Sequence, residues 1–135
     1  MTDGHVQIGE VAERTELSVR TVRHYDDVGL IVPSARSAGG FRLYTEADIA
    51  RLLLVRRMKP LGFTLEEMRE LLEAVDVAEG AEGPDGARET ARATVAGYHQ
   101  RARARCVELR ATLAAAEDFV DRLAGRTAAL PDADR

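Results

Sequence analysis

A short stretch near the N-terminus carries the side chains best suited to binding phosphates and base edges of nucleic acid. Ser18 is a favourable N-cap, and residues Val19 to about Val28 fit a helix with Val19 and Val22 facing inward. The outer side of this helix then carries Arg20, Thr21, Arg23 and His24. Guanidinium groups can read guanine or hold phosphate. From these residues alone, a plain helical hairpin with surface arginines is an equally good interpretation.

A second short helix is expected just before this one. Ile8, Val11 and Ala12 have the i, i+3, i+4 spacing of one buried helical face, and Thr15-Glu16-Leu17 breaks the pattern. Two short helices joined by a tight turn, with cations on the exposed face of the second, indicate a helix-turn-helix.

A small hairpin, or wing, is expected after the helices. Ser37-Ala38-Gly39-Gly40 is a turn signal between two extended runs. The hairpin would present Arg36, Arg42 and Tyr44 to phosphates beside a groove. The alternative is a purely stabilising hairpin; in either case we expect Phe41 or Leu43 in the core and Arg42 outside it.

Two further helices are expected to pack the core. Thr45 caps one that runs to about Lys59, with a buried side made of Ile49, Leu52, Leu53 and Val55. Thr64-Leu65-Glu66-Glu67 is a capping box that opens the other, which reaches about Val75. Lys59 lies near the end of the first of these helices, where it could also reach phosphate, as could Arg56 and Arg57.

The charge is unevenly distributed along the chain. The formal net charge of the 135 residues is -4, yet the window from Arg20 to Lys59 holds eight basic and four acidic side chains. Phosphate binding needs only a local basic patch. On charge alone, an ordinary solvated face explains the window as well.

Composition divides the chain into four segments. Residues 1–75 form the winged helix-turn-helix domain, and the acidic, glycine-rich residues 76–87 form a flexible linker. Residues 88–124 form one long helix that ends at Gly125 as its C-cap. Residues 125–135 form a short tail that has no room for an effector domain. The fold class is therefore mainly α, with a β-hairpin wing and a long C-terminal coiled-coil helix.

The long helix carries a stripe with 4-3 spacing, which predicts a coiled-coil seam. The seam consists of Val95, His99, Ala102, Cys106, Leu109, Leu113, Ala116, Val120 and Leu123. A helix of this length spans roughly 55 Å, more than so small a domain can cover, so a second copy of the chain is the expected partner. The alternative is that the helix folds back on the N-terminal part, but a two-column stripe is narrow for that packing.

Five stretches in register resemble the MerR family of transcriptional regulators. They are Ile8 to Ala12, Ser18 to Asp26, Gly29 to Ile31, Gly39 to Thr45 and Leu61 to Glu67. The resemblance covers roughly the first 75 residues, and the long helix follows where the family has its antiparallel dimerisation helix. It implies DNA contacts for the second helix and the wing, at Arg20, Thr21, Arg23, Tyr25, Arg36, Arg42 and Tyr44.

The resemblance also implies a mechanism. A homodimer would bind an inverted repeat within a promoter and bend and untwist the spacer, so that RNA polymerase holoenzyme engages both promoter elements. The runner-up is an architectural or excisionase-like DNA-binding protein without an inducer, although such proteins usually lack a long dimer helix. A coiled-coil protein that has lost DNA binding is a third possibility. An enzyme is the poorest interpretation, because no phosphate loop, metal-ligand spacing or activated nucleophile is found.

The sequence does not identify a signal. No cofactor and no metal site are expected, and the tail lacks the cysteine cluster of metal-sensing relatives. An unknown small-molecule inducer stays open, as does the choice between activation and repression. Cys106, the single cysteine, is either a small seam residue or an oxidisable or alkylatable thiol. Without a signal-peptide core or a membrane-length apolar run, a cytoplasmic protein with no membrane partner is expected.

Overall fold

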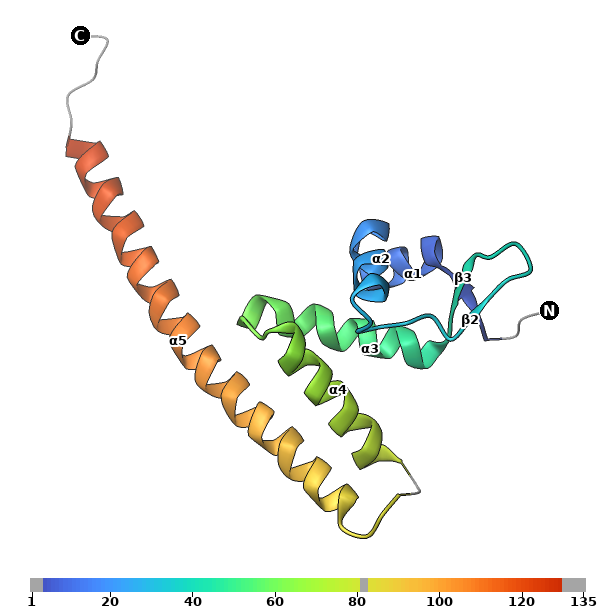
Figure 1. The fold of residues 1–135 in the computed structure, drawn as a ribbon. Helices are drawn as coiled ribbons and strands as arrows, with labels where there is room; N and C mark the ends of the chain where they lie inside the picture. Colours follow the sequence, from blue (N-terminus) through green and yellow to red (C-terminus); the bar gives the residue numbers. More distant parts are fainter. Residues whose placement is uncertain (1–3, 81–82, 130–135) are drawn as a thin grey trace. The chain divides into compact units, whose positions relative to one another are not determined.

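The computed structural model describes residues 4–80 and 83–129 and is mainly helical, as predicted. Within these residues the elements follow one another as β1 (Val6–Gln7), α1 (Ile8–Thr15), α2 (Val19–Asp27), β2 (Ala35–Arg36), β3 (Arg42–Tyr44), α3 (Glu46–Met58), the 3-10 helix η1 (Lys59–Leu61), α4 (Leu65–Glu79) and α5 (Ala87–Ala129). Figure 1 shows this order along the ribbon. No helix of the described residues has the length and apolarity needed to cross a bilayer.

The chain divides into two compact units. The first comprises residues 1–96 and the second residues 97–135, so the boundary falls within α5. The first unit holds the sheet, α1 to α4 and the start of α5; the second holds the rest of α5.

The core of the first unit lies where α1, α2, α3 and β3 meet. Val11 of α1, Val22 of α2 and Leu52 of α3 are fully buried there, and Tyr44 of β3 is buried with them. Aliphatic side chains at helical spacing thus fix how α1 packs against α2, α3 and β3.

The strands form one antiparallel sheet in the order β1-β3-β2. Val6 is opposite Tyr44, and Arg36 is opposite Arg42. The hairpin of β2 and β3 was predicted, but β1 was not, because two residues are too few to show strand alternation. Since β1 leads directly into α1, it joins the wing to the start of the helix-turn-helix.

The predicted helix starts are confirmed. The side chains of Ser18, Thr45 and Thr64 each accept a hydrogen bond from a backbone N–H in the first turn of α2, α3 and α4. Thr45 with Asp48 and Thr64 with Glu67 form complete capping boxes.

Two predicted helix ends are wrong. Helix α4 continues past Val75 to Glu79, because the acidic segment contains no Gly or Pro before Gly80. Helix α5 passes through Gly125 to Ala129, so Gly125 is not its C-cap. A glycine inside a helix costs only about 1 kcal/mol relative to alanine, which the surrounding helix formers offset.

Candidate nucleic-acid interface

The outer face of α2 presents two arginines that have no charged partner among the described residues. Arg20, Arg23 and His24 are exposed, and within the described residues neither arginine has an ion pair or side-chain hydrogen bond. Helix α2 begins at Val19, so Arg20 lies in its first turn, where side chains can reach base edges when such a helix enters the major groove.

Thr21 contributes mainly to the cap of this helix. Its backbone N–H donates to Ser18 Oγ at 3.0 Å, and the two hydroxyls share a hydrogen bond of 2.9 Å. The side chain is half-buried, so it supports the N-terminus that carries Arg20.

An ion pair joins the wing to α2. Arg42 Nε on β3 donates to Asp26 Oδ2 on α2 at 2.6 Å, and Arg36 Nη2 lies 3.7 Å from the same oxygen. Both partners of the short pair are shielded, the Asp26 side chain being 11% and the Arg42 side chain 24% exposed. The hydrogen bond to Asp26 raises the pKa of Arg42 above its ordinary value. Arg42 lies outside the core, as expected, but its charge is already directed at Asp26.

Two tyrosines assigned to the DNA contact lie inside the fold. Tyr25 is 3% exposed and Tyr44 is fully buried, so neither side chain is available to DNA in this conformation. Burial raises the pKa of both phenols. The motif spacing placed both tyrosines near DNA, but it could not distinguish a side chain that packs in the core from one that contacts DNA. The Tyr44 hydroxyl is buried without a hydrogen-bond partner in the described residues.

The wing tip is a structured turn. Gly40 has a positive φ of 82°, its N–H donates to Ser37 O at 2.9 Å, and Arg36 Nη1 donates to Gly40 O at 3.2 Å. Of the two aromatic or aliphatic candidates for the core, Leu43 is buried and Phe41 is 64% exposed.

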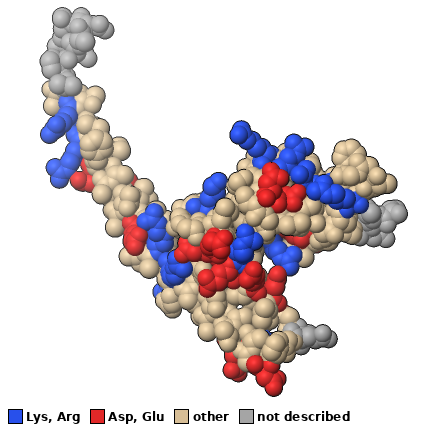
Figure 2. Space-filling model, viewed as in Figure 1, with Lys and Arg blue, Asp and Glu red and all other residues tan. Residues whose placement is uncertain are grey.

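The C-terminal end of α3 adds two exposed cations. Arg57 and Lys59 have no ion pair or side-chain hydrogen bond among the described residues. Arg56 differs, because its Nη2 lies 2.6 Å from Glu16 Oε2. Figure 2 shows basic side chains over α2 and towards the strands, with an acidic patch among them, and further acidic side chains near α4.

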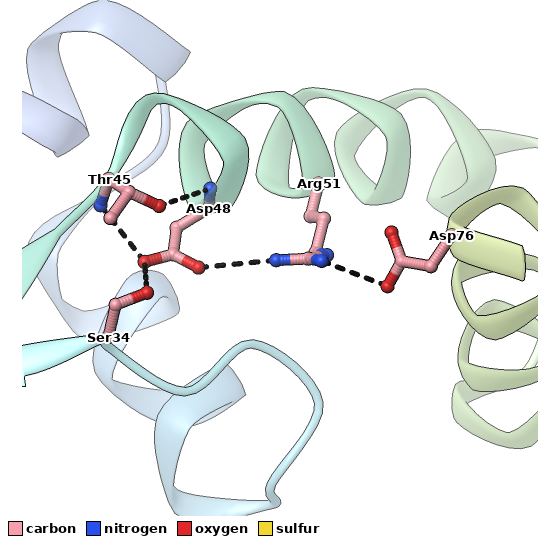
Figure 3. Close-up of polar contacts among 5 residues, drawn as sticks. All are labelled: Ser34, Thr45, Asp48, Arg51 and Asp76. Carbon is pink, nitrogen blue, oxygen red and sulfur yellow. Dashed lines mark hydrogen bonds and ion pairs between the residues drawn. The ribbon is translucent and has the colours of Figure 1, made fainter. Parts of the chain in front are cut away.

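A buried carboxylate that the sequence motifs did not indicate, that of Asp48, binds the residue just before β2 of the wing (Figure 3). Asp48 is 3% exposed, and its Oδ2 accepts from Ser34 Oγ at 2.7 Å and from Thr45 N at 2.9 Å. Arg51 connects it onward, lying 3.4 Å from Asp48 Oδ1 and 2.9 Å from Asp76 Oδ2. The Thr-x-x-Asp spacing was a visible capping signal, but Ser34 and Asp76 are distant in sequence.

The predicted seam residues all lie on α5. Val95 and Ala102 are half-buried, and the rest of the seam is exposed, including Leu113 at 59% and Val120 at 61%. Cys106 is a free, exposed thiol. Among the described residues no group of three His, Cys, Asp or Glu side chains could hold a metal ion.

Sequence models of two families match the chain. The model described as MerR HTH family regulatory protein matches residues 6–75, and that described as MerR, DNA binding matches residues 49–126. The chain belongs to the MerR family.

Individual relatives agree with this membership. The HTH-type transcriptional regulator ZntR of Escherichia coli (strain K12) is 46% identical over 66 residues, which cover 49% of this chain and 47% of ZntR. The chain thus spans about half the length of that relative. The crystal structure of the transcription regulator PbrR691 from Ralstonia metallidurans CH34, in complex with lead(II), is 34% identical with a TM-score of 0.53 and covers 86% of each chain. A MerR family regulator from Bacillus cereus shares the fold, with a TM-score of 0.68 at 22% identity over 97% of this chain and 86% of that one.

Proposed function

We propose that the chain is a DNA-binding transcriptional regulator that acts as a homodimer on an inverted repeat in a promoter. The observation that carries the proposal is the set of uncommitted cations on α2, Arg20 and Arg23, next to a wing that Asp26 holds through Arg42. Free guanidinium groups on the outer face of the second helix are available for bases and phosphates.

The dimer is supported by α5. It has 43 residues, most of which belong to the second unit, and large apolar side chains are exposed along the predicted seam. Antiparallel pairing of two such helices would hold two helix-turn-helix units at a fixed separation, as a two-fold operator requires. A long helix of this kind favours a regulator over an excisionase-like protein.

The proposed mechanism acts through DNA deformation. Each unit of the dimer would grip one half-site, so that a change in their separation or tilt bends and untwists the spacer between them. RNA polymerase holoenzyme would then engage both promoter elements. A small-molecule inducer is the proposed trigger, and the side chains described assign no site to it.

The test is protection mapping on the promoter beside the chain's own gene, followed by titration of that DNA. Arg20→Ala and Arg23→Ala should each weaken binding about five- to thirty-fold and reduce the salt slope by about two, because each removes one DNA contact from each half of the dimer. Arg88→Ala, an exposed arginine on α5, is the matched control and should leave both unchanged. Unaltered affinity in both α2 variants would contradict the assigned face.

A further inference from the structure

One residue in the turn of the helix-turn-helix has a backbone conformation that its side chain does not favour. Glu16, which directly follows α1, has a φ of 58°, and among the described residues it is the one residue other than glycine with a positive φ. Its N–H donates to Glu13 O, and Leu17 N donates to Ala12 O at 3.2 Å, which are the hydrogen bonds of a Schellman motif. Glycine adopts the left-handed conformation of this motif without steric cost, whereas glutamate does not. The backbone of the turn therefore gives no reason for a glutamate at this position.

The Glu16 side chain forms an ion pair with α3. Its Oε2 accepts a hydrogen bond from Arg56 Nη2 at 2.6 Å, from a residue 40 positions away in the sequence. The pair is open to water, the Glu16 side chain being 73% and the Arg56 side chain 41% exposed. Exposed ion pairs contribute little to stability, because water screens them and two long side chains must be held still. The pair therefore compensates poorly for the strained backbone, and a competing anion can open it.

The pair lies beside the end of α2 that the proposed function directs at DNA. Glu16 comes two residues before Ser18, the N-cap of α2, and four residues before Arg20. Phosphates repel a carboxylate at this place, and a cation beside it attracts them. Arg56 is thus close to the proposed DNA surface, but its charge is already matched within the chain.

The cations that follow Arg56 in the sequence are not matched in this way. Arg57 and Lys59 are exposed, and neither has an ion pair or a side-chain hydrogen bond in the described part of the chain. These free cations can bind phosphate directly, whereas Arg56 must first leave Glu16. Glu16 therefore removes one of three neighbouring basic side chains from the surface available to phosphate.

We propose that Arg56 is a phosphate-binding side chain that Glu16 holds away from DNA, with the Glu16 carboxylate standing in for a backbone phosphate. The inference rests on the proposed DNA-binding function and adds an intramolecular competitor to it. A guanidinium uses the same planar N–H donors for a carboxylate and for a phosphate, so engagement by one reduces its availability to the other. The strained backbone at Glu16 is then explained by the need for a carboxylate beside Arg56.

A double-mutant cycle on DNA binding tests the competition. Glu16→Gln should strengthen binding to the mapped promoter DNA about five- to twenty-fold, because it frees Arg56 for a phosphate in each half of the dimer. It should also make the salt slope steeper by about two, since each new phosphate contact releases a counterion. Arg56→Ala should cancel most of this gain. The loss that Arg56→Ala causes should therefore be larger in the Glu16→Gln background than in the unaltered chain.

Two further variants separate the competition from charge and from folding. Glu13→Gln is the matched control, because Glu13 is an exposed acid on α1 with no ion pair among the described residues. It removes the same charge and should strengthen binding about twofold or less, without a change in salt slope. Glu16→Gly removes the carboxylate together with the strained backbone. It should bind DNA as tightly as Glu16→Gln does and resist urea at least as well as the unaltered chain.

The outcomes distinguish this inference from the proposed function. A larger gain for Glu16→Gln than for Glu13→Gln, lost when Arg56→Ala is added, supports the competition. Equal gains, or a gain that persists with Arg56→Ala, would show that Glu16 acts only through its charge and would overturn the inference. Weaker resistance to urea in both Glu16 variants without tighter binding would assign the pair a structural role and overturn it as well. Failure of the unaltered chain to bind any duplex, even at low salt, would contradict the proposed function and, with it, this inference.

Discussion

Asp26 is an acidic side chain on the surface proposed to face phosphates, where a negative charge is unfavourable in itself. Its partner explains its presence, because the 2.6 Å contact with Arg42 ties β3 to α2. In this account Asp26 contributes by positioning the wing relative to the recognition helix. The cost of its charge is reduced because Arg42 and Arg36 both lie close to the same oxygen of the carboxylate.

If Asp26 positions the wing, its removal should weaken DNA binding, whereas charge repulsion alone predicts that removing a negative charge strengthens binding. Asp26→Ala should weaken DNA binding about five- to thirty-fold, even though it removes a negative charge, because the wing loses its fixed orientation. Fluorescence anisotropy with the mapped promoter DNA measures the change. Asp27→Ala removes the neighbouring exposed acid and should leave binding unchanged or strengthen it. Tighter binding by Asp26→Ala would show that the pair does not position the wing.

A second ion pair gives a pH prediction. Arg14 on α1 donates two hydrogen bonds to Glu46 at the start of α3, at 2.8 and 2.6 Å, and these lower the pKa of Glu46 from its ordinary value of 4.5. Because the folded-state pKa is depressed, the stabilisation is present above pH 4.5 and is lost as the pH falls through the lowered value. An NMR titration of the Glu46 carboxyl should show its pKa rise towards 4.5 in Arg14→Gln. An unchanged titration would mean that the pair does not persist in solution.

The sequence predicted where some of these side chains lie in the structure but not the packing of others. Ser18, Arg20 and Arg23 lie as expected, because capping chemistry and helical periodicity are local properties. Tyr25, Tyr44 and Arg42 differ, since their use depends on what β1, α3 and Asp26 bring next to them. Those neighbours come from distant parts of the chain, and local spacing cannot reveal them.

At the scale of elements, the two capping boxes differ in their surroundings. In the box that starts α4, Thr64 is exposed and Glu67 is half-buried, and each accepts a hydrogen bond from the backbone N–H of the other. The box that starts α3 uses Asp48, which is buried and also holds Ser34 and Arg51. The same sequence pattern therefore caps both helices, and at α3 its acidic member also binds Ser34 and, through Arg51, is linked to Asp76 of α4.

The difference predicts unequal losses of stability. Asp48→Ala should lower the free energy of unfolding by about 2 to 4 kcal/mol, because it leaves several buried polar groups unpaired. Thr64→Ala should cost about 1 kcal/mol, as an exposed cap does. Urea unfolding followed by circular dichroism compares the two variants. Equal losses would show that the Asp48 contacts beyond the cap contribute nothing.

Helix starts were easier to predict than helix ends. A Ser or Thr cap has a specific hydrogen-bonding task, whereas an acidic run such as Asp76 to Glu79 can end a helix or extend it. The structure extends α4 through it, and Asp76 gains the contact with Arg51 there. The contact between Asp76 and Arg51 thus lies in the segment whose composition did not show whether the helix ends or continues.

At the scale of the whole molecule, the first unit contains most of the core and α5 contains most of the unsatisfied apolar surface. In the second unit, Leu113, Phe119 and Val120 are each about 60% exposed, although a soluble helix usually turns such residues towards a partner. Leu113 and Val120 belong to the seven-residue repeat, which is visible in the sequence without tertiary information, whereas Phe119 does not. The sequence could not predict the groove between α3 and α4, where Leu53 is half-buried instead of lying in the core, because the walls of this groove only meet in the folded unit.

The dimer itself is tested by changing the stripe while keeping the helix. Leu109→Glu with Leu113→Glu places four carboxylates in a paired seam, so charge repulsion and desolvation should outweigh the lost apolar contact and yield monomers. The matched control is Val107→Glu with Ala111→Glu, which has the same spacing and added charge on exposed positions outside the seam. Light scattering at micromolar concentration should report a monomer for the first pair and a dimer for the second.

Glutamate is a good helix former, so neither pair should disrupt α5 itself. The helical circular dichroism signal of the two variants should therefore be similar when both are compared as monomers or both as dimers. Monomers from both pairs would mean that added charge anywhere on α5 disrupts assembly, and dimers from both would place the contact on another face of the helix.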